Sequence, residues 1–305
     1  MHLHALYVHP VKGARGAAVA AAEVHPRGLR HDRRWMIIDA AGRFVSQRTL
    51  PRLRALVPHL GADRLTLTLD PAADRAADRA ADPTLAPGAT PPPLDLPLDA
   101  PAHADRHARV WGDDVPVASC GPDADAWLAA WLGPGYALVR LPKEAHRSVD
   151  PAFGRPDDGV SFADGYPYLV ITTASLAALS RAAGRTFDAT RFRANLVIDG
   201  ADAWAEDGWR HLRVGEATFE LVKPCVRCVV TTLDPAGAPA PDAPAAAREP
   251  LATLARIHAT AKGPAFGMNA LARGGDVVRV GDPADATDAP PGTSPADLGA
   301  PGPAG

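Results

Sequence analysis

Short apolar segments separated by turn-forming residues recur along this chain of 305 residues. The clearest is Leu65–Leu69, which reads Leu-Thr-Leu-Thr-Leu, and the segments Leu6–Val8 and Arg34–Ile38 precede it. Alternation of apolar and polar residues is typical of a β-strand with one buried face, and the sequences at Pro26–Gly28 and Asp39–Gly42 are typical of turns. Residues 6 to 69 are therefore predicted to form a small antiparallel sheet or barrel.

The rest of the chain combines more strands of this kind with a few helices. Together with Phe44–Val45, the further predicted strands are Tyr168–Thr172, Asn195–Ile198, His211–Val214, Ala217–Val222, Val226–Leu233 and a final one at Val277–Val280. The predicted helices are Ser175–Ala183, Pro250–Ala259, and Ala124–Leu132, whose Trp127, Leu128, Trp131 and Leu132 share one face. These segments predict a fold that is mainly β with some α.

The composition changes twice along the chain. Residues 71–105 are rich in Ala, Asp and Pro, and the residues after Asp282 are dominated by Pro, Ala, Gly, Asp and Thr. Such segments bury too little apolar surface to offset the entropy that is lost on ordering. We therefore expect a first subdomain at residues 1–120 with a flexible insertion at 71–105, a second subdomain at 121–283, and a disordered tail at 284–305.

The charge balance argues against a nucleic-acid or membrane partner. Lys and Arg number 32 and Asp and Glu number 35, which gives a net charge of -3, so no overall field favours an anionic polymer or surface. The chain has no run of about 18 apolar residues, and Met1–Ala5 lacks the regions of a signal peptide. We expect a cytoplasmic protein. The glycine-rich phosphate loops of nucleotide-binding proteins are absent as well.

Two of the three cysteines, Cys225 and Cys228, lie close together where a loop runs into a predicted strand. Three cysteines cannot form a disulfide framework in so long a chain. A structural zinc site normally needs about four Cys or His ligands, and no second cysteine pair or close histidine pair is present. A redox dithiol needs a helix N-terminus at the pair, but Val229–Thr232 is strongly β-branched, which disfavours a helix.

Two other interpretations of the pair remain. Buried cysteines often behave as small apolar residues, but Arg227 between them favours an anionic partner instead. The alternative is a single metal thiolate, because residues three apart on a strand point to opposite faces and would not naturally share one ligand. One of Cys225 and Cys228 would then face the site while the other packs behind it. Cys120 is expected to be inert.

The segment Lys223–Pro235 closely resembles the signature of MOSC-domain proteins, named after the molybdenum-cofactor sulfurase C-terminal domain. The match is especially close to the branch that contains the mitochondrial amidoxime reducing component and its bacterial relatives. Further segments resemble the family in the same order along nearly the whole chain: His9–Gly13, Gly28–Trp35, Ser161–Pro167, Phe192–Val197, Phe266–Asn269 and Val280–Asp282. The resemblance implies an N-terminal MOSC β-barrel subdomain packed on a β-barrel-like MOSC domain, with a molybdenum-molybdopterin cofactor between them.

The same resemblance implies which residues hold the cofactor. The second cysteine of the motif, Cys228, would ligate the molybdenum, and Cys225 would be its non-ligating neighbour. The implied cofactor contacts are Lys12, Gly13, Arg33, Asp164, Arg193, Val226, Arg227 and Asn269. Relatives often carry Ser at the position of Gly13, so only a backbone contact is expected there. Independently of the family, Lys12, Arg33 and Arg193 are side chains suited to the terminal phosphate of a pterin cofactor.

The branch implies a molybdenum enzyme that reduces small N-hydroxylated or N-oxygenated compounds, with Cys228 as the catalytic metal ligand. Some bacterial relatives carry a ferredoxin-like domain, but no cysteine follows Cys228 here, so an iron–sulfur cluster of that kind is excluded. Electrons are therefore expected from a separate donor, either a flavin reductase or a ferredoxin-like or haem protein. The alternative is a molybdenum-cofactor carrier or a sulfur-transfer protein, in which Cys228 holds the cofactor or a persulfide.

Overall fold

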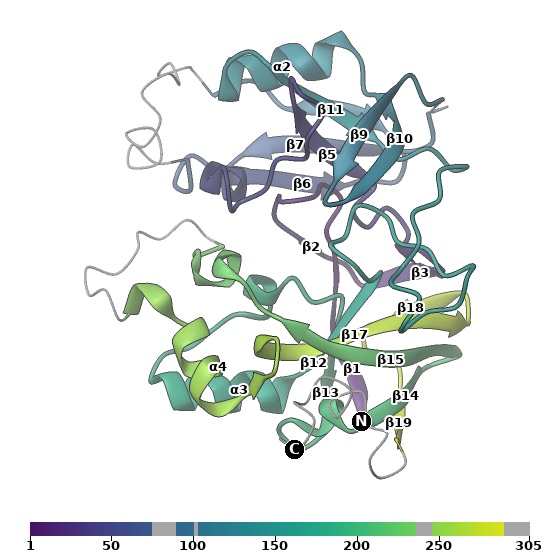
Figure 1. Ribbon diagram of the computed structural model, residues 1–305, viewed down its shortest axis with the longest axis vertical. Coiled ribbons are helices and arrows are strands. Elements are labelled where there is room, and N and C mark those ends of the chain that lie inside the picture. Colours follow the sequence, from purple (N-terminus) through teal and green to yellow (C-terminus); the bar gives the residue numbers. More distant parts are fainter. Residues whose placement is uncertain (75–89, 101–102, 236–245, 290–305) are drawn as a thin grey trace.

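The computed structural model describes residues 1–74, 90–100, 103–235 and 246–289. It shows two bodies, one above the other in Figure 1. The upper body contains β5 (Trp35–Asp39), β6 (Leu56–Leu60), β7 (Arg64–Leu69), β8 (Leu94–Pro97), β9 (Arg106–Val110), β10 (Asp113–Ser119), α2 (Pro122–Leu132) and β11 (Tyr136–Arg140). Its strands pair antiparallel in the orders β5-β11-β10-β9 and β6-β7-β8.

The lower body is built on a nine-stranded sheet, counted over the described residues, with the order β19-β14-β15-β17-β12-β13-β1-β2 and with β16 paired to β17. Its strands are β1 (His2–Val8), β2 (Ala17–Ala18), β12 (Tyr168–Thr172), β13 (Leu196–Asp199), β14 (Trp209–Val214), β15 (Ala217–Val226), β16 (Ala259–Thr260), β17 (Gly263–Gly274) and β19 (Ala284–Asp288). A smaller sheet has the order β18 (Val277–Arg279), β3 (Ala21–His25) and β4 (Gly28–Leu29).

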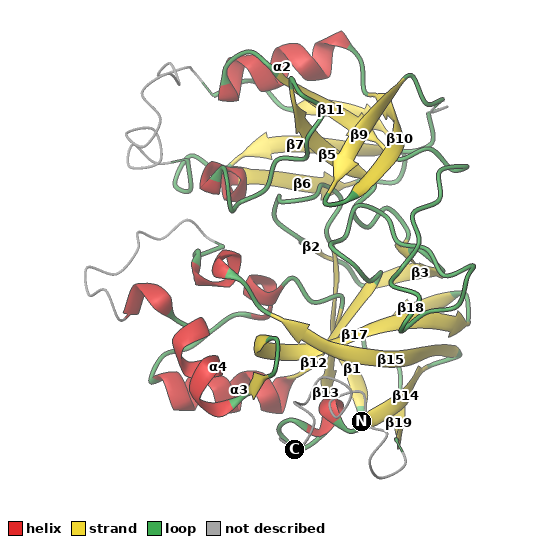
Figure 2. Ribbon diagram, in the orientation of Figure 1, coloured by secondary structure: helices red, strands yellow, loops and turns green. Residues whose placement is uncertain are grey.

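Helices are few and lie at the outside of the sheets (Figure 2). The strands β12 and β13 run parallel, and the chain between them forms α3 (Thr173–Ala183), because parallel neighbours require a crossover connection. Next to α3 lies α4 (Leu251–Ile257) (Figure 1). The prediction of a mainly β fold with some α is confirmed.

The two bodies do not correspond to the residues before and after position 120, where the division was expected. Strand β1 pairs with β13 in the lower sheet, although it belongs to the first residues of the chain. Strand β11 lies beyond residue 120 but pairs with β5 in the upper body. Each body is therefore assembled from segments that are distant in sequence, and the chain crosses between the bodies more than once.

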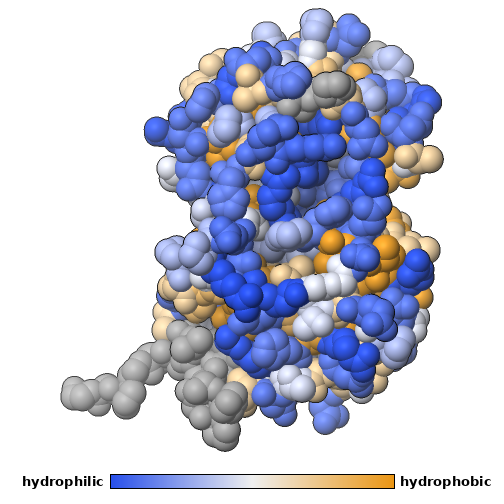
Figure 3. Space-filling model, turned by 90° about the vertical axis from the view of Figure 1, so that its right-hand side faces the viewer, coloured by the Kyte–Doolittle hydropathy of each residue, from blue (hydrophilic) through white to orange (hydrophobic). Residues whose placement is uncertain are grey.

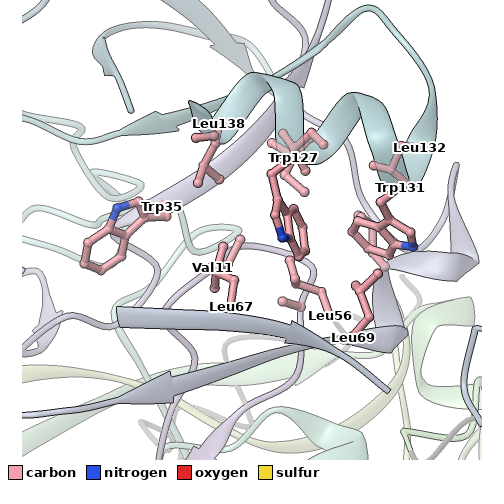
Figure 4. Packing of buried hydrophobic residues seen from close by; sticks show 14 of the residues in the cluster. Val11, Trp35, Leu56, Leu67, Leu69, Trp127, Trp131, Leu132 and Leu138 are labelled. Carbon is pink, nitrogen blue, oxygen red and sulfur yellow. The ribbon is translucent and has the colours of Figure 1, made fainter. Parts of the chain in front are cut away.

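Helix α2 closes the core of the upper body. The side chains of Trp127, Leu128, Trp131 and Leu132 are buried, as their spacing on one helical face predicted. They pack on Trp35 and on the apolar residues of β6 and β7, and the two tryptophan rings meet edge to face with centres 5.8 Å apart (Figure 4). Burial of this apolar surface stabilises the upper body as a unit.

The strand predicted at Val226–Leu233 is wrong. Strand β15 ends at Val226, and the residues after Cys228 form a short 3₁₀ helix, η4 (Val229–Thr232). The hydroxyl of Thr231 donates to the carbonyl of Cys228 at 2.9 Å, and Thr232 does the same to Val229 at 2.8 Å. These side-chain bonds to carbonyls three residues back offset the weak helical preference of the β-branched run.

Several regular elements lie where irregular chain was expected. Strand β8 falls within the proposed insertion at residues 71–105, of which 75–89 and 101–102 lie outside the described residues. Strand β19 falls within the proposed tail, of which 290–305 are outside that range too. Partners explain both, because β8 pairs with β7 and β19 with β14. In the described part of the chain, no helix is long and apolar enough to span a membrane.

Candidate functional site

A cavity of about 420 Å³ lies where the two bodies meet, and residues of both line it. On the face shown in Figure 3, hydrophilic side chains gather around a hollow between the bodies. All the residues singled out from the sequence line this cavity: Lys12, Gly13, Arg33, Asp164, Arg193, Val226, Arg227, Cys228 and Asn269. The fold thus brings together segments that are far apart along the chain.

The two cysteines lie on either side of the end of β15. Cys225 is in the strand, and Cys228 immediately precedes η4. Both line the cavity, and Cys225 also packs against the apolar cluster that includes Phe192. The expected division, with one cysteine in the site and the other behind it, is therefore only partly confirmed. The reason is that the chain leaves the strand conformation after Val226, so the alternation of faces stops applying.

A different guanidinium contacts each sulfur. Arg227 donates through Nη1 to Cys225 Sγ at 2.8 Å and through Nη2 to the carbonyl oxygen of Phe192 at 2.7 Å. Arg48 lies in the loop between β5 and β6, and its Nη2 donates to Cys228 Sγ at 3.2 Å. The sulfur of Cys228 is thus contacted from the upper body, while that of Cys225 is contacted by its own segment.

Asp164 is bound by two cations. Lys12 Nζ lies 2.5 Å from Asp164 Oδ1, and Arg48 Nη2 lies 3.2 Å from Asp164 Oδ2. Burial on its own would raise the pKa of Asp164, but Lys12 and then Arg48 outweigh that effect and hold the pKa well below its usual range. Burial lowers the pKa of Lys12 to about 8, against the opposing effect of Asp164. One carboxylate therefore forms ion pairs with two cations.

Arg33 and Arg193 both have left-handed backbone conformations, with φ of 47° and 57°. Such conformations are strained for residues other than glycine and cluster at functional sites. Arg33 has a carboxylate partner, because its Nη1 lies 2.5 Å from Asp32 Oδ2. Arg193 donates through Nη1 to the carbonyl of Ala14 and, within the described ranges, has no carboxylate at ion-pair distance. Burial and then Arg33 lower the pKa of Arg193 to about 9.

Gly13, Val226 and Asn269 line the cavity without adding charge. The carbonyl of Gly13 accepts a hydrogen bond from Gln47 Nε2 at 2.7 Å, and φ is 82° there. The amide of Asn269 donates through Nδ2 to the carbonyl of Pro224 at 3.3 Å. These contacts fix the cavity wall. They leave the backbone N–H of Gly13 and the side-chain oxygen Oδ1 of Asn269 as groups that a ligand could use.

Positive charge is concentrated in the cavity. Among the described residues, seven basic side chains and one acidic side chain line it, although the whole chain has a net charge of -3. The basic ones are Lys12, Arg33, Arg48, Arg193, Lys223, Arg227 and Lys262, and the acidic one is Asp164. An excess of one sign in a partly enclosed space favours a ligand of the opposite sign. The arrangement is therefore suited to an anionic ligand.

The donor set limits what kind of metal centre could lie here. In the part of the chain that is described, no group of three or more His, Cys, Asp or Glu side chains is placed to hold a metal ion. A metal bound by Cys228 would thus take its remaining ligands from a cofactor, water or substrate. The buried Nε of Arg227 has no hydrogen-bond partner among the described residues, which suits an anionic acceptor. The residues present therefore fit an anionic cofactor that brings its own metal ligands.

Several residues that line the cavity were not singled out from the sequence, and four of them carry a charged group or a phenol: Arg48, Tyr166, Lys223 and Lys262. Lys223 lies at the start of the cysteine motif and Tyr166 two residues after Asp164, so the wider motifs already contained them. Arg48 and Lys262 lie in loops without a local signal that points to a ligand. Only the folded arrangement shows that their side chains reach the same cavity.

Both parts of the chain match known families. Residues 1–134 match the MOSC N-terminal beta barrel domain, and residues 157–285 match the MOSC domain. The chain is 31% identical to mitochondrial amidoxime-reducing component 1 of Homo sapiens in an alignment 297 positions long that covers 91% of this chain and 80% of that protein. It is 29% identical to molybdenum cofactor sulfurase of Danio rerio in an alignment 257 positions long that covers 75% of this chain and 28% of that protein.

Proposed function

The chain belongs to the family of MOSC-domain proteins that includes the mitochondrial amidoxime-reducing component, and on that premise we propose that it is a molybdenum-cofactor-dependent reductase of N-oxygenated compounds. The observation that supports this most is the position of Cys228 in a cavity lined by seven basic side chains and one acidic side chain. A thiolate is a soft ligand that suits a heavy transition metal. The surrounding cations suit the phosphate of a pterin cofactor.

In this proposal Cys228 holds the metal, and the other residues singled out from the sequence hold the cofactor. Of these residues, Arg193 and Arg227 are cations without a carboxylate partner within the described residues, and the Nε of Arg227 has no hydrogen-bond partner there. Lys12 and Arg33 already contact Asp164 and Asp32, so they contribute mainly positive potential. Backbone groups at Gly13 and Val226 and the amide of Asn269 complete the proposed contacts.

For an amidoxime, the proposed reaction breaks the N–O bond. Two electrons and two protons enter, and the amidine and one water molecule leave. The cofactor supplies the two-electron chemistry when it is bound. The residues of this chain bind and orient: cations hold the anionic cofactor, and the cavity wall holds the substrate close to it.

A separate protein is proposed to supply the electrons. An iron–sulfur cluster needs about four cysteine ligands, and this chain has three cysteines in all, one of which is the proposed metal ligand. We propose a flavin reductase or a ferredoxin-like or haem protein as the donor. The cytoplasmic location expected from the composition stays a prediction, and cell fractionation would test it.

Matched cysteine variants test the proposed function. We expect the unmodified protein and Cys225→Ser to retain about one molybdenum per chain, and Cys228→Ser to lose most of it, by metal analysis of purified protein. With reduced methyl viologen as donor, the first two should reduce benzamidoxime and the third should not. If the protein binds molybdopterin and molybdenum but reduces no N-hydroxylated compound, the proposed reductase activity is refuted. Loss of the metal in Cys225→Ser alone would reverse the roles of the two cysteines.

A second candidate function is supported by the similarity to molybdenum cofactor sulfurase over 75% of this chain. In that case Cys228 would carry the cofactor or a persulfide rather than hold a catalytic metal. Treatment with cyanide releases thiocyanate from a persulfide. A persulfide carrier should therefore give thiocyanate that disappears in Cys228→Ser, without a stoichiometric amount of molybdenum in the unmodified protein.

A further inference from the structure

Lys223 lies against two aromatic rings at the cavity wall. Its Nζ is 4.7 Å from the ring centre of Phe153 and 5.3 Å from that of Tyr166, and the two ring centres are 6.5 Å apart in an edge-to-face contact. A cation over the face of an aromatic ring is attracted by its π electrons. The rings therefore fix the ammonium group in place without neutralising its charge.

Lys223 and Lys262 are two cations that form no ion pair within the described residues. Over the described ranges, no carboxylate lies at ion-pair distance from either ammonium group, and both side chains line the cavity. Burial and then the charge of Lys262 lower the pKa of Lys223, which means that the two positive charges repel each other. Like charges held together are unfavourable unless an anion binds beside them. The pair is therefore suited to receive an anionic group.

This pair stands apart from the cations around Arg193. Arg193 donates through Nη1 to the carbonyl of Ala14, whereas the ammonium group of Lys223 lies over the rings of Phe153 and Tyr166. The proposed cofactor has a single terminal phosphate, which suits the guanidinium groups around Arg193. The two lysines are then left for a different anion.

Tyr166 adds a neutral donor to the same wall. Its hydroxyl is buried and has no hydrogen-bond partner among the residues that the structure describes, and burial raises the pKa of Tyr166. An unpaired buried hydroxyl is unfavourable, so a ligand that accepts from it gains affinity. A carboxylate carries one negative charge and two acceptor oxygens, which matches an ammonium and a phenol that lie against each other.

We propose that Lys223 and Lys262, together with Tyr166, bind a carboxylate of the substrate, so that the preferred substrates are N-oxygenated compounds that also carry a carboxylate. This inference rests on the proposed function, because it places the N-oxygenated end of the same molecule toward Cys228. Lys223 and Tyr166 are then specificity-determining residues, and their contacts lie on the substrate group that does not react.

Benzamidoxime and its para-carboxylate derivative test this with one difference between the two molecules. Binding of each compound to the purified holoprotein is measured by calorimetry, and reduction is measured with reduced methyl viologen. The unmodified protein should bind the carboxylated compound about tenfold more tightly, the effect of one hydrogen bond to a charged group. Lys223→Met keeps the length and apolar stem of the side chain and should abolish this preference. Lys143→Met removes an exposed lysine that lines no described cavity, and it should leave the preference intact.

The outcomes separate this inference from the proposed function. Equal affinity for both compounds in the unmodified protein, or an undiminished preference in Lys223→Met, would overturn the carboxylate subsite. If Lys223→Met lowers the affinity for both compounds equally and loses molybdenum, Lys223 holds the cofactor instead, and the carboxylate subsite is again overturned. If the preference is present and is lost in Lys223→Met but neither compound is reduced, the subsite stands and the proposed reductase fails. Lys262→Met provides a second variant on an exposed turn, and it should lower the preference about threefold.

Discussion

Single side chains in the cavity differ in how fully their charges are balanced. Arg33 forms an ion pair with Asp32, whereas Lys12 and Arg48 both form ion pairs with Asp164. Of these cations, Lys12 is the one with an ammonium group that can lose its proton near neutral pH, because burial lowers its pKa to about 8. The protonation state of Lys12 therefore changes how much positive charge the cavity offers to an anion.

Sulfate binding should weaken as the pH rises through about 8. Below that pH Lys12 is charged, and above it the cavity loses one positive charge, so affinity should fall about tenfold between pH 7 and pH 9. Sulfate is the chosen probe because its own charge is constant in this range. Calorimetry on cofactor-free protein gives the affinities, and Lys12→Arg should flatten the profile. The same profile in Lys12→Arg and in the unmodified protein would show that another group titrates.

Stability should follow the opposite trend over the next pH interval. The pKa of Lys12 is about 8 in the folded protein and 10.5 when unperturbed, so the unfolded chain binds more protons between these values. The free energy of unfolding contributed by this group therefore rises with pH from about 8 towards 10.5. Urea unfolding at several pH values should show a positive slope that is smaller in Lys12→Met.

Arg48 should contribute to stability through contacts on three sides. Its guanidinium donates to Asp164 and Cys228, and its Cζ lies 4.9 Å from the ring centre of Trp111, which is 47% exposed. Because the ion pair is partly solvated, we expect Arg48→Ala to lower the free energy of unfolding by only about 1 kcal/mol. Urea unfolding followed by tryptophan fluorescence measures this. Arg43→Ala removes an exposed ion pair with Asp39 and should cost less, so equal losses would argue against the combined contacts.

The residues that could be predicted at this scale are those inside recognisable motifs. Cys228 and Arg227 are adjacent in one motif, and their presence in the cavity follows from a short stretch of chain. Arg48 has no comparable signal, because an arginine in a polar loop is usually a solvated charge. Its contact with Cys228 depends on how the two bodies are packed, which local sequence does not encode.

At the scale of elements, the cavity wall depends on an irregularity in β17. Gly267 lies in this strand with φ of 74°, and a Cβ there would lie 2.6 Å from the carbonyl oxygen of Val170 and 2.5 Å from Ile171 Cγ2. The register between β15 and β17 shifts in this region, where Lys223 pairs with Asn269. The glycine therefore lets β17 pack closely on β12 while placing Asn269 at the cavity.

Gly267→Ala should be strongly destabilising. The added methyl group meets backbone and a packed side chain in a conformation that alanine disfavours, and we expect a loss of about 3 kcal/mol in the free energy of unfolding. Gly274→Ala is the matched control in the same strand, because a Cβ there meets nothing within 4 Å. It should change stability by less than about 1 kcal/mol. Equal effects of the two substitutions in denaturant unfolding would contradict this role of Gly267.

Strand prediction succeeded where alternation or an apolar run persists and failed where side chains cap the backbone. Strand β12 has the predicted limits, Tyr168–Thr172, because every residue in it is buried. After Val226 the β-branched residues suggested a strand, but the hydroxyls of Thr231 and Thr232 bond to local carbonyls and favour a 3₁₀ turn. Strands β8 and β19 were missed because their pairing partners, and not their composition, keep them ordered.

At the scale of the whole molecule, the cavity exists because the chain crosses between the two bodies more than once. Strand β1 pairs with β13, and the loop after β1 carries Lys12 to the upper body, where its amide donates to the carbonyl of Trp35 at 2.8 Å. The expected division at residue 120 followed composition, which does not record such pairings. Family resemblance anticipated a site between two subdomains, but the charge excess of the cavity became visible only in the folded arrangement.

An anion bound in this cavity should therefore stabilise the whole protein. A ligand that binds only the folded state adds about 2.7 kcal/mol when its concentration is a hundred times its Kd, which for a chain of this size raises Tm by several degrees. We expect inorganic phosphate to raise the Tm of cofactor-free protein more than chloride does at equal ionic strength. Arg193→Gln should remove most of the difference, because Arg193 lines the cavity without a carboxylate partner in the described residues. Arg155→Gln changes an exposed arginine outside the described cavities and should retain the difference in Tm between phosphate and chloride. Loss of this difference in both variants would indicate general charge screening instead of a binding site.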